Sequence, residues 1–444
     1  MSRSEPTTQI VQRQTPRQRG REAAEAAWRI EWPRLVAGLT RMLGDIDAAE
    51  DLAQDALLAA LEQWPRDGVP ANPGGWLMLT AKHRAIDRRR REATFRRKLS
   101  VLGGELVIED AESPLPTSVD PEGAIEDDLL RMVFTACHPV LSPASRVALT
   151  LRLVGGLTTG EIARAYLMAE STVAQRIVRA KRRIATERVP YEVPHGAELT
   201  NRQDSVLDVI YLIFNEGYAA TSGEDWVRVE LVDEGLRLAR ILTGLMPDEP
   251  EVHGFAALLE LQASRVRARN GRPGTLVLLA DQDRSLWDRL LIRRGFAELG
   301  RAHALNHLKR QPPGRYAVQA AIAAAHAMAA TPQETDWRRI AGLYAILVQR
   351  FPSPIVELNR AVAVAMVDGP GSGLEILEAI ATGGAVSHYH LLHAVRGDLL
   401  ARLGRDHEAA TSFLRAAQLT ANTAEQRFLR DRADACINRP ETAA

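Results

Sequence analysis

Cysteine is almost absent from this chain, which has two among its 444 residues. Cys137 and Cys436 lie in opposite halves of the sequence, and neither belongs to a CxxC or Cys/His pattern. This spacing excludes a disulfide framework and a classical zinc finger. It agrees with a protein of the reducing cytoplasm, which is the compartment we expect.

Aromatic residues are also scarce, at 5%, and no apolar run reaches the roughly 18 residues that a membrane span needs. The first residues are polar and Arg-rich, so we expect neither a signal peptide nor a membrane partner. Ala and Leu are abundant and Val/Thr alternations are few, which predicts an all-α protein. A chain of this length, with 46% hydrophobic residues, should fold as two to four domains.

Net charge is also lacking, because 56 Lys and Arg balance 56 Asp and Glu. Any signal for nucleic acid must therefore be local. Catalytic motifs such as a P-loop, GxSxG or HExxH are missing, so we expect no enzyme activity, catalytic residue or cofactor. His388, His390 and His393 form HxHxxH without nearby carboxylates, and we interpret them as packing or surface residues, with no metal site.

Residues 157–184 carry the clearest local pattern, which is two short helices joined by a tight turn. Thr159 with Glu161 suggests a cap for the first helix. An apolar stripe on the second helix recurs at helical spacing, at Val173, Ile177, Ala180 and Ile184. The opposite face carries side chains that suit phosphates and base edges, namely Ser171, Thr172, Gln175, Arg176, Arg179 and Arg183. This pattern predicts a DNA-binding helix-turn-helix, and the alternative is a helix hairpin with a solvated basic face.

Two further helices precede it, and their charges differ in sign. Residues 47–64 bury an apolar face that includes Leu52, Ala56, Ala60 and Trp64, and line another face with acids. Residues 82–98 hold nine Lys or Arg against two acids, which predicts contact with nucleic acid or, alternatively, a solvated helix end. Between 21 and 43 we expect one or two helices, broken or restarted at Pro33. Residues 99–126 read as an acidic linker.

The C-terminal part is predicted as an α-helical repeat domain. Gly397, Leu400, Gly404, Ala409, Phe413 and Ala416 repeat the spacing of equivalent residues 36 positions earlier, which is typical of tetratricopeptide-like helix pairs. Asn215–Tyr218 form a polar cluster that ends an apolar helix. It is either a cap and turn or a contact between this domain and the preceding ones.

Three motifs in this order resemble a known family. They are AEDLAQDALLAALEQW (49–64), NPGGWLMLTAKHRAIDRRRR (72–91) and LTTGEIARAYLMAESTVAQRIVRAKRRI (157–184). They are similar to regions 2.2, 2.3–2.4 and 4.2 of bacterial extracytoplasmic-function sigma factors of the sigma-70 family. The remaining chain, with IYLIFNEGY (210–218) and YHLLHAVRGDLLARLGR (389–405), resembles the subgroup with a tetratricopeptide-like C-terminal extension.

The resemblance implies a domain organisation. It comprises a disordered arm (1–20), sigma region 2 (21–98), the linker (99–126), sigma region 4 (127–190) and a C-terminal regulatory domain (191–444). The implied partners are core RNA polymerase, through its β′ clamp and β subunits, and promoter DNA as −35 duplex and −10 single strand. The extension would contact a further protein or the chain itself.

The resemblance also assigns residues to these partners. The residues implied to dock on the polymerase clamp are Glu50, Asp51, Gln54 and Asp55. The residues implied to bind the −10 element are Asn72, Trp76, Lys82, Arg84, Arg88 and Arg89. For Trp76 the alternative is a role in the core. The residues implied to bind the −35 element are Ser171, Thr172, Gln175, Arg176 and Arg179. Where the family often has glycine in the turn, this chain has Leu167.

These features predict a sigma factor that directs promoter recognition and transcription initiation and is regulated by its C-terminal extension. The alternative is a stand-alone helix-turn-helix regulator with a repeat-built sensor domain. The block 47–98 favours the sigma factor, because a simple repressor or activator would not need it.

Overall fold

The computed structural model describes residues 16–103, 123–166, 168–224, 226–269, 277–382 and 388–438. The chain divides into two compact units, Met1–Ile162 with Ser171–Ser205, and Ala163–Glu170 with Val206–Ala444. Each is described by itself below. Most of the predicted linker lies outside the described residues, as do residues 1–15 of the predicted arm and Leu167 of the turn.

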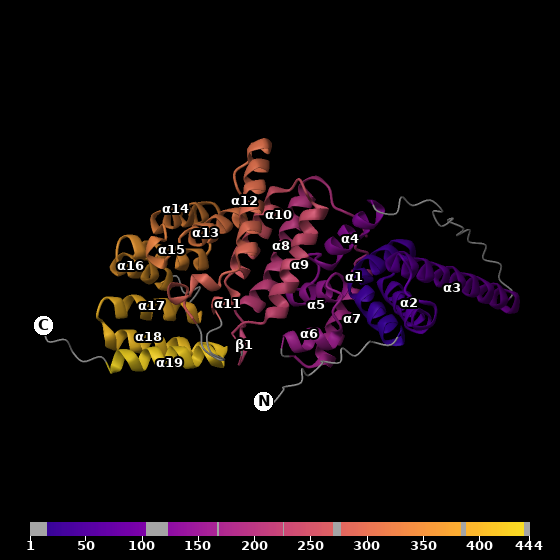
Figure 1. Cartoon of the computed structure of the whole chain (residues 1–444), viewed down its shortest axis with the longest axis horizontal. Helices are drawn as coiled ribbons and strands as arrows, with labels where there is room; N and C mark the ends of the chain where they lie inside the picture. The colour runs from indigo at the N-terminus through magenta and orange to yellow at the C-terminus, as the bar shows by residue number, and fades with distance from the viewer. Residues whose placement is uncertain are drawn as a thin grey trace, which may run out of the picture. The chain divides into compact units, whose positions relative to one another are not determined.

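The described chain is helical almost throughout, which confirms the all-α prediction (Figure 1). Its first helices are α1 (Pro16–Leu43), α2 (Ile46–Asp67), α3 (Pro73–Gly103), α4 (Gly123–Ala136), α5 (Pro143–Leu153), α6 (Thr159–Ala165) and α7 (Glu170–Thr186). No helix in the described ranges is both long and apolar enough to cross a membrane.

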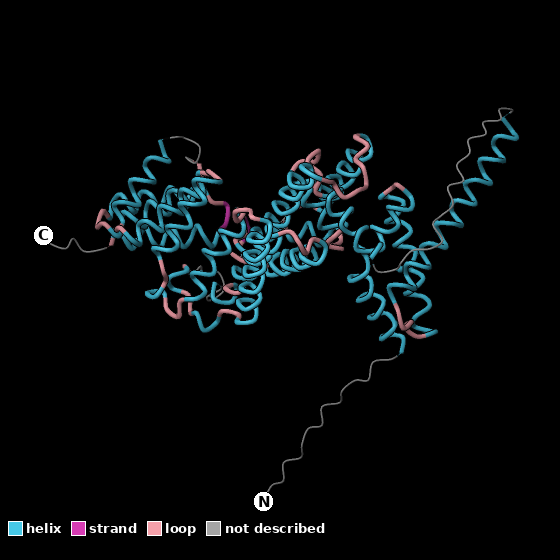
Figure 2. Tube along the Cα trace, turned by 90° about the horizontal axis from the view of Figure 1, so that it is seen from above, coloured by secondary structure: helices cyan, strands magenta, loops and turns pink. Residues whose placement is uncertain are grey.

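Helices α1, α2 and α3 pack together in the first unit. Leu52, Ala56, Ala60 and Trp64 of α2 are all buried, as the sequence pattern predicts. Figure 2 shows the far part of α3 extending as a single helix beyond α1 and α2, and this part carries the basic residues.

The expected break at Pro33 is wrong, because α1 continues through this proline. An internal proline costs a helix about 3 kcal/mol. The burial of Trp32, Leu35, Val36 and Leu39 on the same helix offsets that cost.

The first unit also joins α1 to α4 through a buried carboxylate. Asp128 of α4 accepts hydrogen bonds from Arg41 Nε at 2.9 Å and from Arg131 Nη1 at 2.7 Å. The hydroxyl of Tyr191 lies 2.9 Å from the carbonyl oxygen of Ala37 and 3.0 Å from that of Asp128. Helices of the two predicted sigma regions are therefore fixed to one another within this unit.

The second unit consists of helices that pack mainly on their neighbours in the sequence. Its helices are α8 (Gly196–Tyr218, which begins in the first unit), α9 (Val229–Leu245), α10 (Pro250–Ala263), α11 (Val266–Arg269), α12 (Arg289–Lys309), α13 (Arg315–Met328), α14 (Trp337–Arg350), α15 (Pro354–Val367), α16 (Pro370–Thr382), α17 (His390–Arg402), α18 (Asp406–Leu419) and α19 (Thr423–Ile437). Short 3₁₀ turns are η1 (Leu279–Asp281), η2 (Arg284–Leu286) and η3 (Pro332–Glu334). Strands β1 (Ser222–Gly223) and β2 (Ala421–Asn422) pair in parallel.

The two stretches with equal spacing form equivalent helix pairs, α15 with α16 and α17 with α18. Small residues lie where each pair crosses. A Cβ added to Gly373 would lie 2.6 Å from the Ala365 Cβ, and one added to Gly397 would lie 2.8 Å from the Phe413 ring. Close approach of the helices therefore explains the repeated small residues.

His326, near the end of α13, predicts how acid affects this unit. Burial, and then the charges of Arg265 and Arg284, lower the pKa of His326 from 6.5 to about 3. The unfolded chain therefore takes up a proton below pH 6.5, whereas the folded chain does so only near pH 3. The free energy of unfolding should fall by about 1.4 kcal/mol per pH unit as the pH drops below 6.5.

We expect His326→Gln to flatten this dependence in thermal unfolding scans between pH 7 and pH 5. His407→Gln, which changes an exposed histidine, is the control and should leave the slope unchanged. Equal slopes for the wild type and His326→Gln would contradict the assignment.

Candidate nucleic-acid interface

The predicted recognition helix α7 separates its two faces as expected. Val173, Ile177, Ala180 and Ile184 are buried. Four side chains of the predicted −35 set are exposed, and Arg176 is partly exposed; the exposed four are Ser171, Thr172, Gln175 and Arg179. The structure therefore brings the −35 residues together on one polar surface, and their contacts with DNA stay a prediction.

The cap of α6 differs by one residue from the sequence expectation. Thr158 Oγ1 accepts from the Glu161 backbone N–H at 3.2 Å, and Glu161 Oε2 accepts from the Thr158 backbone N–H at 2.8 Å. This reciprocal pair is a capping box, so Thr158 takes the role expected of Thr159. The seven-residue helix α6 is thereby held at its start.

The predicted −10 residues lie along α3. Asn72 is exposed and caps the helix, because its Oδ1 accepts from the Gly75 backbone N–H at 2.9 Å. Trp76 is half-buried and packs edge-on against Trp64, with ring centroids 5.5 Å apart. This contact gives Trp76 a packing role.

The basic residues of the same set are only partly described. Lys82 is half-buried. Arg84 donates from Nη1 to the backbone oxygen of Asp55 at 2.6 Å, which joins a predicted −10 residue to a predicted polymerase-docking residue. The side chains of Arg88 and Arg89 lie outside the described residues.

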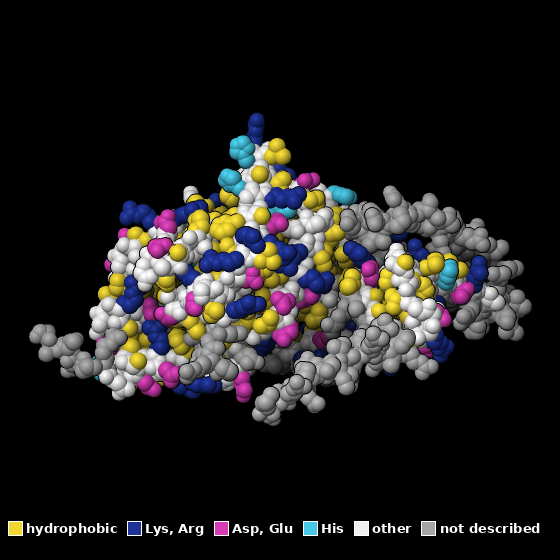
Figure 3. Space-filling view, viewed as in Figure 1, with side chains coloured by type: hydrophobic (Ala, Val, Ile, Leu, Met, Phe, Trp, Pro, Cys, Tyr) yellow, Lys and Arg dark blue, Asp and Glu magenta, His cyan; other side chains and the backbone are white. Residues whose placement is uncertain are grey.

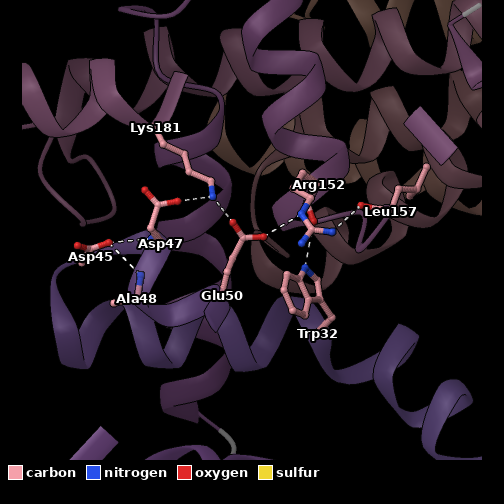
Figure 4. Close-up of polar contacts among 8 residues, drawn as sticks. All are labelled: Trp32, Asp45, Asp47, Ala48, Glu50, Arg152, Leu157 and Lys181. Atoms are coloured by element: carbon pink, nitrogen blue, oxygen red, sulfur yellow. Dashed lines mark hydrogen bonds and ion pairs between the residues drawn. The ribbon is translucent and has the colours of Figure 1, made fainter. Parts of the chain in front are cut away.

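The predicted docking face of α2 divides into two parts. Asp51, Gln54 and Asp55 are exposed, whereas Glu50 is 4% exposed. Figure 4 shows Glu50 between two cations, Arg152 of α5 and Lys181 of α7. Arg152 Nε donates to Glu50 Oε1 at 2.8 Å, and Lys181 binds the other carboxylate oxygen.

This group, which we call the Glu50 cluster, has two further members. Lys181 Nζ donates to Asp47 Oδ1 at 2.6 Å. Trp32 Nε1 donates to the backbone oxygen of Arg152 at 3.0 Å, and the Arg152 guanidinium lies 4.9 Å from the Trp32 ring centroid. Helices α1 and α2 of the predicted region 2 are thus held against α5 and α7 of the predicted region 4 (Figure 4).

Two opposing effects act on the pKa of Lys181. Burial lowers it, but the charge of Glu50 and the hydrogen bonds to Asp47 and Glu50 outweigh burial and raise the pKa above its ordinary value. A lysine whose pKa is raised in the folded state stabilises that state at all pH values below its unfolded pKa. Its contribution is lost only as the pH rises through the higher folded value. The cluster therefore persists at neutral pH.

The sequence pattern does not identify Arg152 and Lys181 as partners of the Glu50 carboxylate. One signal was present for Lys181, since it follows Ile177 by one helical turn and so lies beside the buried stripe of α7. A lysine in that position needs an acidic partner. The sequence offers no means of choosing Glu50 as that partner.

The turn of the helix-turn-helix belongs to the second unit. There Arg228 donates to the backbone oxygen of Ala165, the last residue of α6. Arg228 also pairs with Glu216 of α8 at 2.8 Å, and Glu216 accepts from the Thr221 hydroxyl at 2.8 Å. Glu216 of the Asn215–Tyr218 cluster therefore caps a turn, which is the first of the two alternatives, and it also binds the arginine that contacts Ala165.

The HxHxxH histidines are packing or surface groups in the described structure. His388 is exposed, and His390 Nε2 lies 3.3 Å from Glu425 Oε1. Within the described ranges, no group of three or more His, Cys, Asp or Glu side chains could hold a metal ion.

Three stretches of the chain match known protein families. Residues 31–95 match Sigma-70 region 2, residues 131–184 match Sigma-70 region 4, and residues 202–303 match a family of unknown function, DUF6596. No solved structure counts as a match to the chain. The tetratricopeptide-like subgroup is therefore not confirmed.

Two relatives show more closely which proteins the chain is similar to. The "Probable ECF RNA polymerase sigma factor SigI" of Mycobacterium tuberculosis is 30% identical over 39% of this chain and 58% of its own length. The "Uncharacterized protein R00370" of Rhizobium meliloti is 42% identical over 93% of this chain and 95% of its own length. The chain thus joins sigma-70 region 2 and region 4 domains to a DUF6596 domain, and it belongs to the same family as R00370.

Proposed function

We propose that this protein is an RNA polymerase sigma factor of the extracytoplasmic-function group, which binds core polymerase and directs initiation at promoters. The proposal rests mainly on the order of the matched domains, region 2 followed by region 4. The exposed polar face of α7 agrees with it. The matched domains point to a non-enzymatic initiation factor. Its partners would be the polymerase clamp at Asp51, Gln54 and Asp55, the −10 strand along α3, and the −35 duplex at α7.

Run-off transcription with purified core polymerase tests this proposal. We expect initiation from specific promoter fragments only when the protein is added. The triple variant Asp51→Ala, Gln54→Ala and Asp55→Ala should bind core polymerase more weakly, because it lacks the exposed acidic face. A matched change of exposed acids elsewhere, Glu224→Ala and Glu230→Ala, is the control. DNA binding without promoter-dependent initiation would favour the stand-alone regulator instead.

We also propose that the C-terminal domain regulates the protein by supporting its helix-turn-helix. Helix α6 has seven residues, which is too short to be stable alone. Arg228 caps its last carbonyl, and such a contact satisfies an acceptor that the helix itself leaves unpaired. The extension is therefore expected to be required for −35 recognition.

Arg228→Ala should weaken −35 binding and transcription, because the end of α6 loses its cap at a cost of about 1–2 kcal/mol. The measurement is binding of the full chain to promoter DNA, followed by run-off transcription. Arg293→Ala, which removes an exposed arginine of α12, is the control. Stronger binding by Arg228→Ala would show that the domain inhibits.

Truncation gives a second test, and the structure fixes where to cut. Ser205 Oγ donates to the Cys137 backbone oxygen at 2.7 Å, and Arg202 Nη2 donates to that of Phe134 at 3.1 Å. A cut near residue 190 would remove these contacts of the first unit. The truncated chain should therefore end after Ser205, and we expect it to initiate less than the full chain.

A further inference from the structure

Three arginines of the second unit lie together in its interior, and we call them the arginine cluster. Arg265 follows α10, Arg269 ends α11 and Arg284 begins η2. The ring of Trp287 lies beside two of them, with its centroid 5.0 Å from Arg265 Cζ and 4.9 Å from Arg284 Cζ. The Arg269 guanidinium lies 4.0 Å from the centroid of Tyr218.

Among the described residues, no carboxylate neutralises the cluster. Within the part of the chain that the structure describes, none of the three forms an ion pair. An uncompensated buried charge costs several kcal/mol, so buried guanidinium groups are normally paired.

The contacts that the arginines do make supply only partial charge. Arg265 Nη2 donates to the backbone oxygen of Ala323 at 3.0 Å. Arg284 donates to the backbone oxygens of His326 at 2.9 Å and Ala329 at 2.6 Å, and to Thr335 Oγ1 at 3.0 Å. These carbonyls lie toward or just beyond the end of α13, where the helix dipole favours cations without cancelling a full positive charge.

Hydrogen-bond donors here outnumber the acceptors. The Nε atoms of all three arginines, and the Nε1 atoms of Trp226 and Trp287, are buried without a hydrogen-bond partner. Burial, followed by the charge of Arg269 and Arg284, lowers the pKa of Arg265. Buried donors in native proteins usually have a partner, so such a concentration calls for an acceptor from outside the chain.

Two of the arginines also have donors that the described residues do not use. Among the described residues, Arg265 Nη1 and both Nη atoms of Arg269 make no hydrogen bond, and Arg269 is only half-buried.

The face of the C-terminal helices shown in Figure 3 does not share this imbalance. On the face shown in Figure 3, basic and acidic side chains are interspersed over the C-terminal helices. Arg265 of the cluster is buried, with only 6% of its surface exposed. A site at this depth suits a small molecule better than the surface of a macromolecule.

We propose that the arginine cluster binds a small oxyanion, with a phosphate or carboxylate group held by Arg265 and Arg269. Planar guanidinium groups match both of these anions through paired N–H donors. The cluster lies within residues 202–303, which match the family of unknown function. A ligand there would supply the missing negative charge.

Calorimetric titration of the full chain tests this site, with sodium phosphate, sodium citrate and sodium chloride at equal ionic strength. We expect saturable binding of phosphate, citrate or both, and none of chloride. Which of the two binds identifies the anionic group. Tryptophan fluorescence should change with the same midpoint, because the Trp226 ring centroid lies 5.6 Å from the Arg269 guanidinium.

Arg269→Gln should weaken binding about tenfold or more, since charge-assisted hydrogen bonds are lost. This residue is only half-buried, so its replacement should leave the fold intact, which circular dichroism would verify. Arg267→Gln removes an exposed arginine from the same short helix and should bind like the wild type. Absence of saturable binding for both oxyanions, or equal weakening by Arg267→Gln, would overturn the proposal. The titration needs no polymerase, so its outcome is independent of sigma activity.

Discussion

Glu50→Ala should lower the free energy of unfolding of the first unit by about 3–5 kcal/mol, the usual effect of breaking a buried ion pair. The variant leaves Arg152 without its carboxylate and Lys181 with only the exposed Asp47. Both cations are largely buried, with side chains 17% and 11% exposed, so water cannot replace the lost charge fully. Hydrogen-exchange mass spectrometry should show faster exchange in peptides from α2 and α7.

Asp51→Ala is the matched control for this change. It removes the same charge from the next residue of the same helix, but Asp51 is exposed. We expect an effect within about 0.5 kcal/mol. The double variant Glu50→Ala and Lys181→Ala should be less destabilised than the sum of its single changes, because the two residues are in contact. Equal exchange in Glu50→Ala and Asp51→Ala would show that the cluster does not hold the helices together.

Gln175→Ala should reduce discrimination between the preferred −35 sequence and its single-base variants by about 1–3 kcal/mol, or about 5- to 150-fold. Gln175 is exposed on α7, one helical turn from Ser171 and Arg179, on the face that the helix-turn-helix presents. A glutamine side chain can bind a base edge with both its amide groups, whereas alanine cannot. The measurement is binding to duplexes selected from a randomised library by the wild-type protein.

Arg182→Ala serves as the comparison on the same helix. Arg182 is exposed but lies outside the predicted −35 set. Its loss should weaken binding to all sequences alike and reduce the dependence of binding on salt. A change of sequence preference in Arg182→Ala but not in Gln175→Ala would move the base contacts to another face of α7.

Particular elements show which structural features the sequence pattern predicts and which it does not. The spacing of Val173, Ile177, Ala180 and Ile184 predicted the buried face of α7, because helical periodicity depends only on residues near one another in the chain. The same reasoning failed at Pro33, where a local helix-breaking preference is outweighed by burial of the surrounding side chains. It also placed Glu50 on an exposed acidic face.

By itself, the sequence determined the all-α class, the helix-turn-helix and the order of the domains. These follow from periodicity, caps and motifs, which are local properties. Only the tertiary structure decided which charges are neutralised. It buried Glu50 between Arg152 and Lys181, brought Arg228 to the end of α6, and gathered Arg265, Arg269 and Arg284 with no acid from the described residues beside them. The physical reason is that the energy of a charge depends on its burial and on neighbours that are distant in the chain.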